Sequence, residues 1–193
     1  KIAQAVQDVG GYFLDAPMTR TPKEAAEGRL NLIVGGDRQV YEHCLPVLRS
    51  YAENIGYSGG VGCGHQMKLL HNYVSLGFSA VLAEAAACPH QAGTDPKTFC
   101  DILAAGGGGG VVLNRLRPYI ESEDPSGFRF SISNALKDMG YYCTMAEEQS
   151  AHDVLALAVR QLYEDASQAG LGQSPVPVLI DRLGGAPAAA AGD

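Results

Sequence analysis

The sequence predicts a chain of two parts, an α/β layer over residues 1–62 followed by an all-α bundle over residues 63–185. Short apolar runs alternate with helical patterns as far as Tyr57. Beyond His65 the chain is rich in Leu and Ala at helical spacing and has no further strand pattern. A length of 193 residues, 46% of them hydrophobic and 18% charged, is typical of a globular chain with one domain or slightly more. The Ala-, Gly- and Pro-rich tail at 186–193 is expected to be loose.

In the first part, apolar residues at helical spacing predict a helix over 1–9, which a pair of glycines ends. Thr21 before Pro22 is typical of a helix start, and Asp37 is a suitable cap for a helix over 38–50. Short apolar runs predict three strands of one sheet, at 12–14, 30–34 and 54–57. A sheet of three strands has open edges, so we expect further strands from outside this chain.

In the second part, a Leu- and Ala-rich stretch predicts one long helix over 67–92. Further helices are expected at 95–105, 111–119, 132–148 and 155–169. Five consecutive glycines, Gly106–Gly110, lie between two of them. They are not followed by Gly-Lys-Ser/Thr, so they indicate a flexible connector rather than a phosphate-binding loop.

Composition excludes several classes of function. The chain has 14 Lys and Arg against 21 Asp and Glu, a net charge of −7 with no basic stripe, which argues against nucleic-acid binding. No apolar run reaches the ~18 residues of a membrane span, and the first residues lack the apolar core of a signal peptide. Five cysteines without a C-x-x-C pair, and histidines without ligand spacing, predict no metal site and a reducing, cytoplasmic location.

One candidate for chemistry is the stretch Gly62-x-Gly64-x-x-x-Lys68-x-x-x-Asn72. Lys68 and Asn72 are four residues apart and share one face of the long helix. A lysine near a helix N-terminus has a lowered tendency to hold its proton, which suits a donor to a carbonyl oxygen. On chemistry alone, however, an exposed lysine beside an asparagine is the commoner arrangement.

Two further candidates are short polar stretches. Thr19, Arg20 and Thr21 follow a strand end and offer two hydroxyls and a planar cation, which suit a carboxylate, sulfonate or phosphate. A capped turn with a surface arginine explains them equally simply. Lys137 and Asp138 are adjacent on a predicted helix, where such charges are usually only solvated.

Together these segments resemble the β-hydroxyacid dehydrogenase family, which includes 3-hydroxyisobutyrate dehydrogenases and tartronate semialdehyde reductases. Four blocks occur in the family's order and span nearly the whole chain. They are a substrate-loop block, Phe13-Leu-Asp15-Ala-Pro17 with Gly28-x-Leu30 and Gly35-Gly36; the Gly62 to Asn72 block; Leu82-Ala-Glu84-Ala with Ala92-Gly93; and Phe128 to Leu136-Lys137-Asp138.

The resemblance implies a Rossmann-type domain that binds NAD or NADP, followed by a helical domain like the C-terminal domain of 6-phosphogluconate dehydrogenase. It implies that Lys68 exchanges a proton with the substrate oxygen and that Asn72 orients the substrate. Thr19, with Arg20 and Thr21, would hold a small anionic substrate. Lys137, with Asp138, would approach the nicotinamide. The helical domain would form the contact of a homodimer or homotetramer.

Two departures from the family pattern matter. The phosphate-binding G-x-G-x-x-G and the first strands of the family are absent, so we expect this chain to be the C-terminal piece of a longer enzyme. Arg20-Thr21 stands where the common family loop has Gly-Gly, which resembles sulfolactaldehyde reductases and predicts a more anionic substrate than hydroxyisobutyrate. Two alternatives are an inactive helical dimerisation fragment and a module that binds acidic metabolites without redox chemistry.

Overall fold

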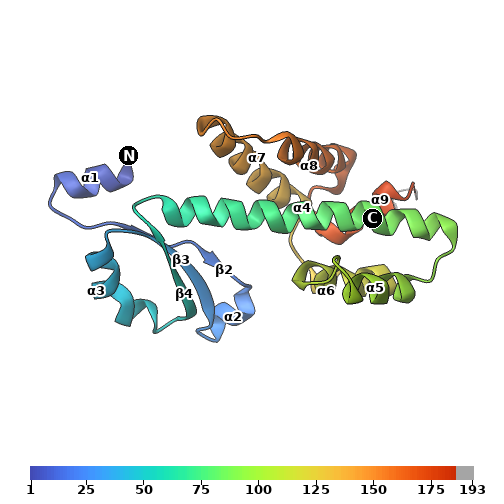
Figure 1. Ribbon diagram of the computed structural model, residues 1–193, viewed down its shortest axis with the longest axis horizontal. Helices are drawn as coiled ribbons and strands as arrows, with labels where there is room; N and C mark the ends of the chain where they lie inside the picture. The colour runs from blue at the N-terminus through green and yellow to red at the C-terminus, as the bar shows by residue number, and fades with distance from the viewer. Residues whose placement is uncertain (186–193) are drawn as a thin grey trace. The chain divides into compact units, whose positions relative to one another are not determined.

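A computed structural model describes residues 1–185, except for the side chains of 89–92, so the tail expected at 186–193 lies outside the described chain (Figure 1). The chain packs as two units, Lys1–His71 and a second that begins at Asn72. The first is α/β and the second is all-α, as the sequence predicts. The division falls inside a long helix, whereas the sequence boundary at 62/63 stands at the start of that helix.

The first unit is a small sheet built around one long strand. Strand β3 pairs antiparallel with β1 and β2 and parallel with β4. In chain order its elements are α1 (Ile2–Asp8), β1 (Leu14–Asp15), β2 (Met18–Thr19), α2 (Pro22–Ala26), β3 (Leu30–Gly36), α3 (Arg38–Leu48) and β4 (Ala52–Gly59).

The prediction of a strand at 12–14 is wrong in its limits, because β1 begins only at Leu14. Its ladder joins Leu14 to Gly36, the last residue of β3, so the residues before Leu14 have no pairing partner in the described chain. Strand β2 was not predicted, since two residues are too few to show alternation. The strand expected at 30–34 is present as β3, which starts at the predicted residue and continues to Gly36. The strand expected at 54–57 is present as β4, which is longer at both ends.

Alternating side chains of β3 supply the core of this unit. Leu30, Leu32 and Val34 are buried, and they pack with residues of α3 and β4. The rings of Tyr41 on α3 and Tyr57 on β4 lie 5.0 Å apart, and the Tyr57 hydroxyl donates to the Gly36 carbonyl at 2.9 Å. These contacts hold α3 against the sheet near the end of β3.

The second unit is a helical bundle. Helix α4 (Cys63–Ala92) starts in the first unit and continues into this one. The further elements are α5 (Pro96–Ala105), α6 (Val111–Ser122), a 3-10 turn (Pro125–Gly127), α7 (Ile132–Glu148), α8 (Val154–Ala166), a π turn (Ser167–Leu171), a second 3-10 turn (Val176–Val178) and α9 (Leu179–Leu183). Within residues 1–185 no strand follows β4, as predicted. The glycines at 106–110 connect α5 to α6.

Fully buried side chains from several helices form the bundle core, among them Leu113, Leu116, Ile132, Met139 and Tyr163. The Tyr163 hydroxyl, on α8, donates to a backbone carbonyl of α4 at 2.9 Å. Because an α8 side chain reaches a backbone atom of α4, the two helices are held in one register.

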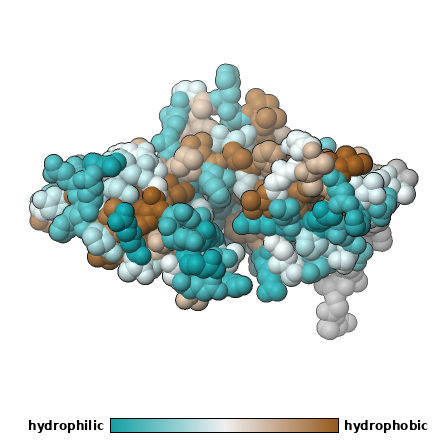
Figure 2. Space-filling model, turned by 60° about the horizontal axis from the view of Figure 1, so that its bottom comes forward, coloured by the Kyte–Doolittle hydropathy of each residue, from teal (hydrophilic) through white to brown (hydrophobic). Residues whose placement is uncertain are grey.

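Polar and apolar side chains are interspersed on the face shown in Figure 2. Helix α4 carries large apolar residues that are about half exposed, with Val74, Phe78 and Val81 at 54%, 51% and 63%. Their spacing places them on one side of the helix. Within the described chain, none of the helices has the length and apolar character to cross a bilayer.

Candidate active site

Asp15 ties the end of strand β1 to the beginning of helix α4. Its side chain is only 1% exposed. One carboxylate oxygen accepts the backbone N–H of Gly62 at 2.6 Å, and the other accepts the N–H of His65 at 2.8 Å and faces His65 Nδ1 at 3.2 Å. The N–H groups of a first helical turn have no acceptor within their own helix. Asp15, which is distant in the sequence, supplies acceptor oxygens for two of these groups.

Two glycines allow this close approach. A Cβ on Gly64 would lie 2.5 Å from the Ile33 carbonyl oxygen and 2.7 Å from the Asp15 carboxylate. A Cβ on Gly35 would lie 2.6 Å from the Gly64 nitrogen and 2.7 Å from the same carboxylate. Gly64, the second glycine of the Gly62-x-Gly64 pair, is therefore required because the helix packs directly on the sheet at this residue. This explanation does not involve a bound phosphate.

Helix α4 carries Lys68 and Asn72 on successive turns. Lys68 lies three residues beyond His65, the last residue whose N–H Asp15 holds, and it is half-buried. The four-residue spacing puts both side chains on the same side of the helix. The predicted helix over 67–92 begins earlier, at Cys63, so Lys68 stands in the second turn of α4 rather than in the first.

Asn72 contacts a second predicted pair in the bundle. Its Nδ2 donates to a carboxylate oxygen of Asp138 on α7 at 2.8 Å. The Lys137 ammonium lies 3.3 Å from the other oxygen of Asp138, whose side chain is 13% exposed while that of Lys137 is 52% exposed. Asp138 is therefore itself largely buried and bound to two partners, so it is not merely one half of a solvated charge pair.

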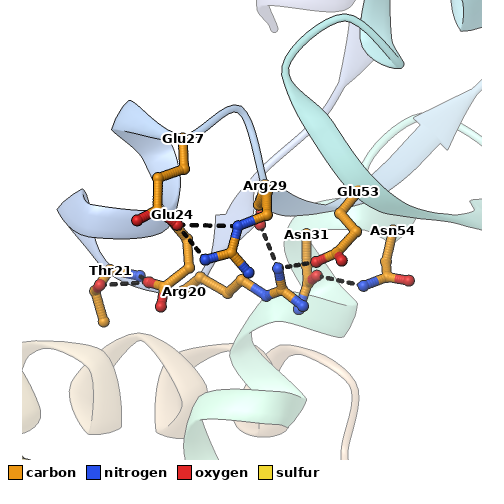
Figure 3. A network of polar contacts seen from close by, with 8 residues as sticks. All are labelled: Arg20, Thr21, Glu24, Glu27, Arg29, Asn31, Glu53 and Asn54. Atoms are coloured by element: carbon orange, nitrogen blue, oxygen red, sulfur yellow. Dashed lines mark hydrogen bonds and ion pairs between the residues drawn. The ribbon is translucent and has the colours of Figure 1, made fainter.

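Arg20 and Thr21 belong to a polar network of the first unit (Figure 3). Thr19 is the last residue of β2 and pairs with Asn31 of β3. The Arg20 guanidinium donates to the Arg29 carbonyl at 2.5 Å and forms an ion pair with Glu53 of β4. The Arg20 guanidinium is thus paired with a carboxylate and hydrogen-bonded to a carbonyl oxygen, both through Nη1, and an anion bound to this cation would compete with Glu53.

Thr21 has a structural task in the same network. Its backbone N–H and its hydroxyl both donate to the carboxylate of Glu24, which caps helix α2. The hydroxyl is the main reason that the pKa of Glu24 falls to about 2. The capped turn considered at the sequence level is therefore present.

The backbone at Arg20 is strained. Its φ is +82°, a left-handed conformation that favours glycine. Arg20 occupies this conformation at a cost of about 1–2 kcal/mol. Strain of this kind is often found where a side chain serves binding.

The structure brings some of the predicted residues together within a unit. Asn72, Lys137 and Asp138 form one cluster in the bundle, and Arg20 and Thr21 belong to one network in the first unit. The sequence reasoning missed Asp15 and Glu53 as partners of the site. The position of Asp15 at the end of a predicted strand, where ligands and helix starts meet in α/β sheets, is the signal that could have indicated it.

The helix N-termini of the first unit are the places where its fold could bind a diphosphate. Helices α2, α3 and α4 follow strands, and each already holds a carboxylate at its N-terminus, from Glu24, Asp37 and Asp15 respectively. A diphosphate at any of them would meet like charge. The N-termini of these three helices therefore do not suit the diphosphate of a dinucleotide.

Comparison with protein families gives two adjacent matches. Residues 62–180 match a family described as the NAD-binding domain of NADP-dependent 3-hydroxyisobutyrate dehydrogenase. Residues 1–59 match the NAD-binding domain of 6-phosphogluconate dehydrogenase. The two matches together cover nearly all of the chain.

Individual relatives agree with these matches. The chain is 29% identical over 183 residues to glyoxylate/succinic semialdehyde reductase 2 of Arabidopsis thaliana, covering 94% of this chain and 51% of that protein. It is 29% identical over 192 residues to the 3-hydroxyisobutyrate dehydrogenase of Pseudomonas aeruginosa, covering 93% and 64%. The solved 3-hydroxyisobutyrate dehydrogenase of Mycobacterium tuberculosis has the same fold, with a TM-score of 0.82 at 23% identity over 94% of this chain and 65% of its own. The chain thus spans between about half and two thirds of these relatives.

Proposed function

Because the chain belongs to the β-hydroxyacid dehydrogenase family, we propose that its protein is an NAD(P)-dependent oxidoreductase. The proposed reaction interconverts a small β-hydroxy acid, or a related anionic hydroxy compound, and its semialdehyde or keto form. The names of the relatives, a semialdehyde reductase and a hydroxyacid dehydrogenase, support this class of substrate.

The observation that carries the proposal is the hydrogen bond from Asn72 to Asp138. These residues are 66 positions apart and belong to two different blocks of the family pattern. Their contact at 2.8 Å supports a shared role for the two blocks, which Lys137 joins through its ion pair with Asp138. A chance similarity of sequence would not be expected to produce such a contact.

In the proposed mechanism, Lys68 moves the proton. As an ammonium it donates to the carbonyl oxygen of the substrate as negative charge develops there, and in the opposite direction the neutral amine accepts the proton of the hydroxyl. Asn72, one turn further along α4, orients the substrate, and its amide is held by Asp138. The bound nicotinamide supplies or accepts the hydride.

Lys137 and Asp138 would hold the nicotinamide end of NAD or NADP. The ammonium of Lys137 is half exposed and remains available to a polar group of the cofactor, while Asp138 limits its reach. The diphosphate would require residues other than those described here, because carboxylates cap the strand-to-helix turns of the first unit.

Thr19, Arg20 and Thr21 would hold the anionic group of the substrate. The left-handed backbone and planar guanidinium of Arg20 support a binding role, and its ion pair with Glu53 supplies a competitor that a weakly charged substrate would not displace. We therefore infer that a strongly anionic substrate is preferred. Replacing Arg20 by glycine should raise KM without lowering stability, since glycine relieves the positive φ.

We also infer that the protein works in the cytoplasm as a homodimer or homotetramer joined through its helical unit. All five cysteines are free thiols, which suits a reducing compartment. The half-exposed apolar row of Val74, Phe78 and Val81 on α4 suits a contact between helices.

The test is steady-state reduction of a panel of semialdehydes by NADH and NADPH, using the whole natural polypeptide that contains this chain. Lys68→Ala should lower kcat by at least ~10²-fold with a much smaller change in KM. Lys68→Arg should not restore the rate, because a guanidinium is a poor proton donor.

Near-normal kcat in Lys68→Ala would refute the assignment of the proton to this residue. Absence of any nicotinamide-dependent turnover, with acidic metabolites still bound, would favour the alternative of a non-redox binding module. A folded oligomer with neither property would favour a dimerisation fragment.

A further inference from the structure

We propose that Asp15 is a positioning residue for Lys68. Its carboxylate holds the first turn of helix α4 against the end of strand β1 and so sets where the lysine stands relative to the sheet. The importance of this for turnover rests on the proposed function, whereas the mechanical link itself does not.

The contacts of Asp15 are unusually complete for one side chain. Both oxygens are engaged, one by the Gly62 N–H at 2.6 Å and the other by the His65 N–H at 2.8 Å, and the carboxylate is almost fully buried. A buried carboxylate is costly unless such donors compensate it, and the positive end of the helix contributes to that compensation. The carboxylate and the helix start therefore stabilise each other.

The backbone around this contact is closely packed. Gly64 sits so close to Ile33 and Asp15 that a methyl group would not fit, and Gly35 approaches the same carboxylate from β3. The first turn of α4 is thus enclosed by two strands and by the side chain that bonds it. A glycine pair and an aspartate from three separate segments meet at one point.

Lys68 follows His65 by three residues on the same helix. At 1.5 Å of rise per residue, its Cα lies less than one helical turn beyond the last N–H that Asp15 holds. An unanchored first turn frays readily, because its N–H groups have no partner in the helix. A displacement of about 1 Å in a catalytic group can cost ~10²-fold in rate, so an anchor this close controls proton transfer.

The chain offers a matched pair of variants at His65. His65→Gln removes the exposed imidazole but keeps the backbone N–H that bonds Asp15. His65→Pro removes the N–H as well, at a first-turn position that tolerates proline. The preceding Gly64 has no Cβ to clash with the proline ring. The direct variant, Asp15→Asn, keeps the size of the side chain and replaces one acceptor oxygen by a donor.

The experiment combines amide hydrogen exchange with steady-state kinetics on the whole polypeptide. In Asp15→Asn, the amides of Gly62 and His65 should exchange at least about ten-fold faster while that of Val34 in β3 stays protected. The same variant should lower kcat at least about ten-fold with KM changed by less than about two-fold. His65→Gln should behave like the wild type in both measurements.

Should Asp15→Asn not fold, His65→Pro takes its place, with the expected loss of kcat and faster exchange over the remaining first turn of α4. Unchanged exchange in a folded variant would show that Asp15 does not anchor the helix. Faster exchange with normal kcat would show that the anchor does not serve Lys68. Either result overturns the proposal. Lack of turnover in the wild type would instead refute the proposed function, and the exchange measurement would still test the anchor.

Discussion

The same substitution, glycine to alanine, should have opposite effects at two places on helix α4. At Gly64 an added Cβ would lie 2.5, 2.7 and 2.9 Å from three oxygen atoms, two of which belong to the backbone of Ile33 and Asp15. At Gly77, apart from the adjacent residues and the neighbouring backbone of its own helix, no atom of the described chain lies within 4 Å of the added Cβ. The two sites therefore separate the intrinsic preference of a helix for alanine from the cost of crowding.

The magnitudes follow from these distances. In a helix interior alanine is favoured over glycine by about 1 kcal/mol, so Gly77→Ala should increase the free energy of unfolding by up to that amount. At Gly64, crowding of a packed position costs about 1–3 kcal/mol, and displacing the Asp15 carboxylate would weaken hydrogen bonds worth a further ~1 kcal/mol. The small gain in helix propensity from alanine in a first turn does not offset these costs. We therefore expect Gly64→Ala to lower the free energy of unfolding by about 2 kcal/mol.

Thermal and urea unfolding of the two variants would measure the contrast. For a chain of this length, 1 kcal/mol corresponds to a shift in Tm of about 2–4 °C, so Gly77→Ala should melt higher and Gly64→Ala lower than the wild type. Since the chain packs as two units, hydrogen exchange is compared between the β3 amides of the first unit and the α7 amides of the second. Faster exchange in β3 alone would show that the loss of stability in Gly64→Ala is confined to the first unit. A Gly64→Ala variant as stable as the wild type would refute the close packing of α4 on the sheet.

Three further changes test other parts of the structure. Glu53→Gln removes the charge that holds Arg20, so KM for the most anionic substrate should fall in steady-state assays, and a rise would contradict the binding role of that arginine. In Thr21→Val the pKa of Glu24 should rise from about 2 towards the ordinary carboxylate value, because the hydroxyl is the main cause of its lowering; a carboxyl NMR titration would measure it. Since folding lowers that pKa, the wild-type cap should persist above the ordinary carboxylate pKa and be lost only as the pH falls towards about 2. Tyr163→Phe should lower the free energy of unfolding by about 1 kcal/mol through loss of one buried hydrogen bond, and an unchanged urea midpoint would contradict that bond.

Local patterns in the sequence are enough to predict most of the elements. The helix expected over 132–148 is the observed α7, because its spacing of apolar residues reflects the side that faces the core. The central strand β3 was predicted from a short apolar run with a turn at each end. Tyr12 was misassigned to a strand because pairing depends on a neighbour that local apolarity does not reveal.

For the site, the four-residue spacing in the sequence is enough to place Lys68 and Asn72 on one side of a helix, because this follows from helical geometry alone. The folded chain was needed to show that Asp15 reaches the start of that helix across 47 and 50 residues, and that Asp138 reaches Asn72 across 66. Such contacts depend on strand register and helix packing, which arise from the whole chain at once. Residue type and periodicity describe each segment separately, so they cannot indicate which distant carboxylate will meet which donor.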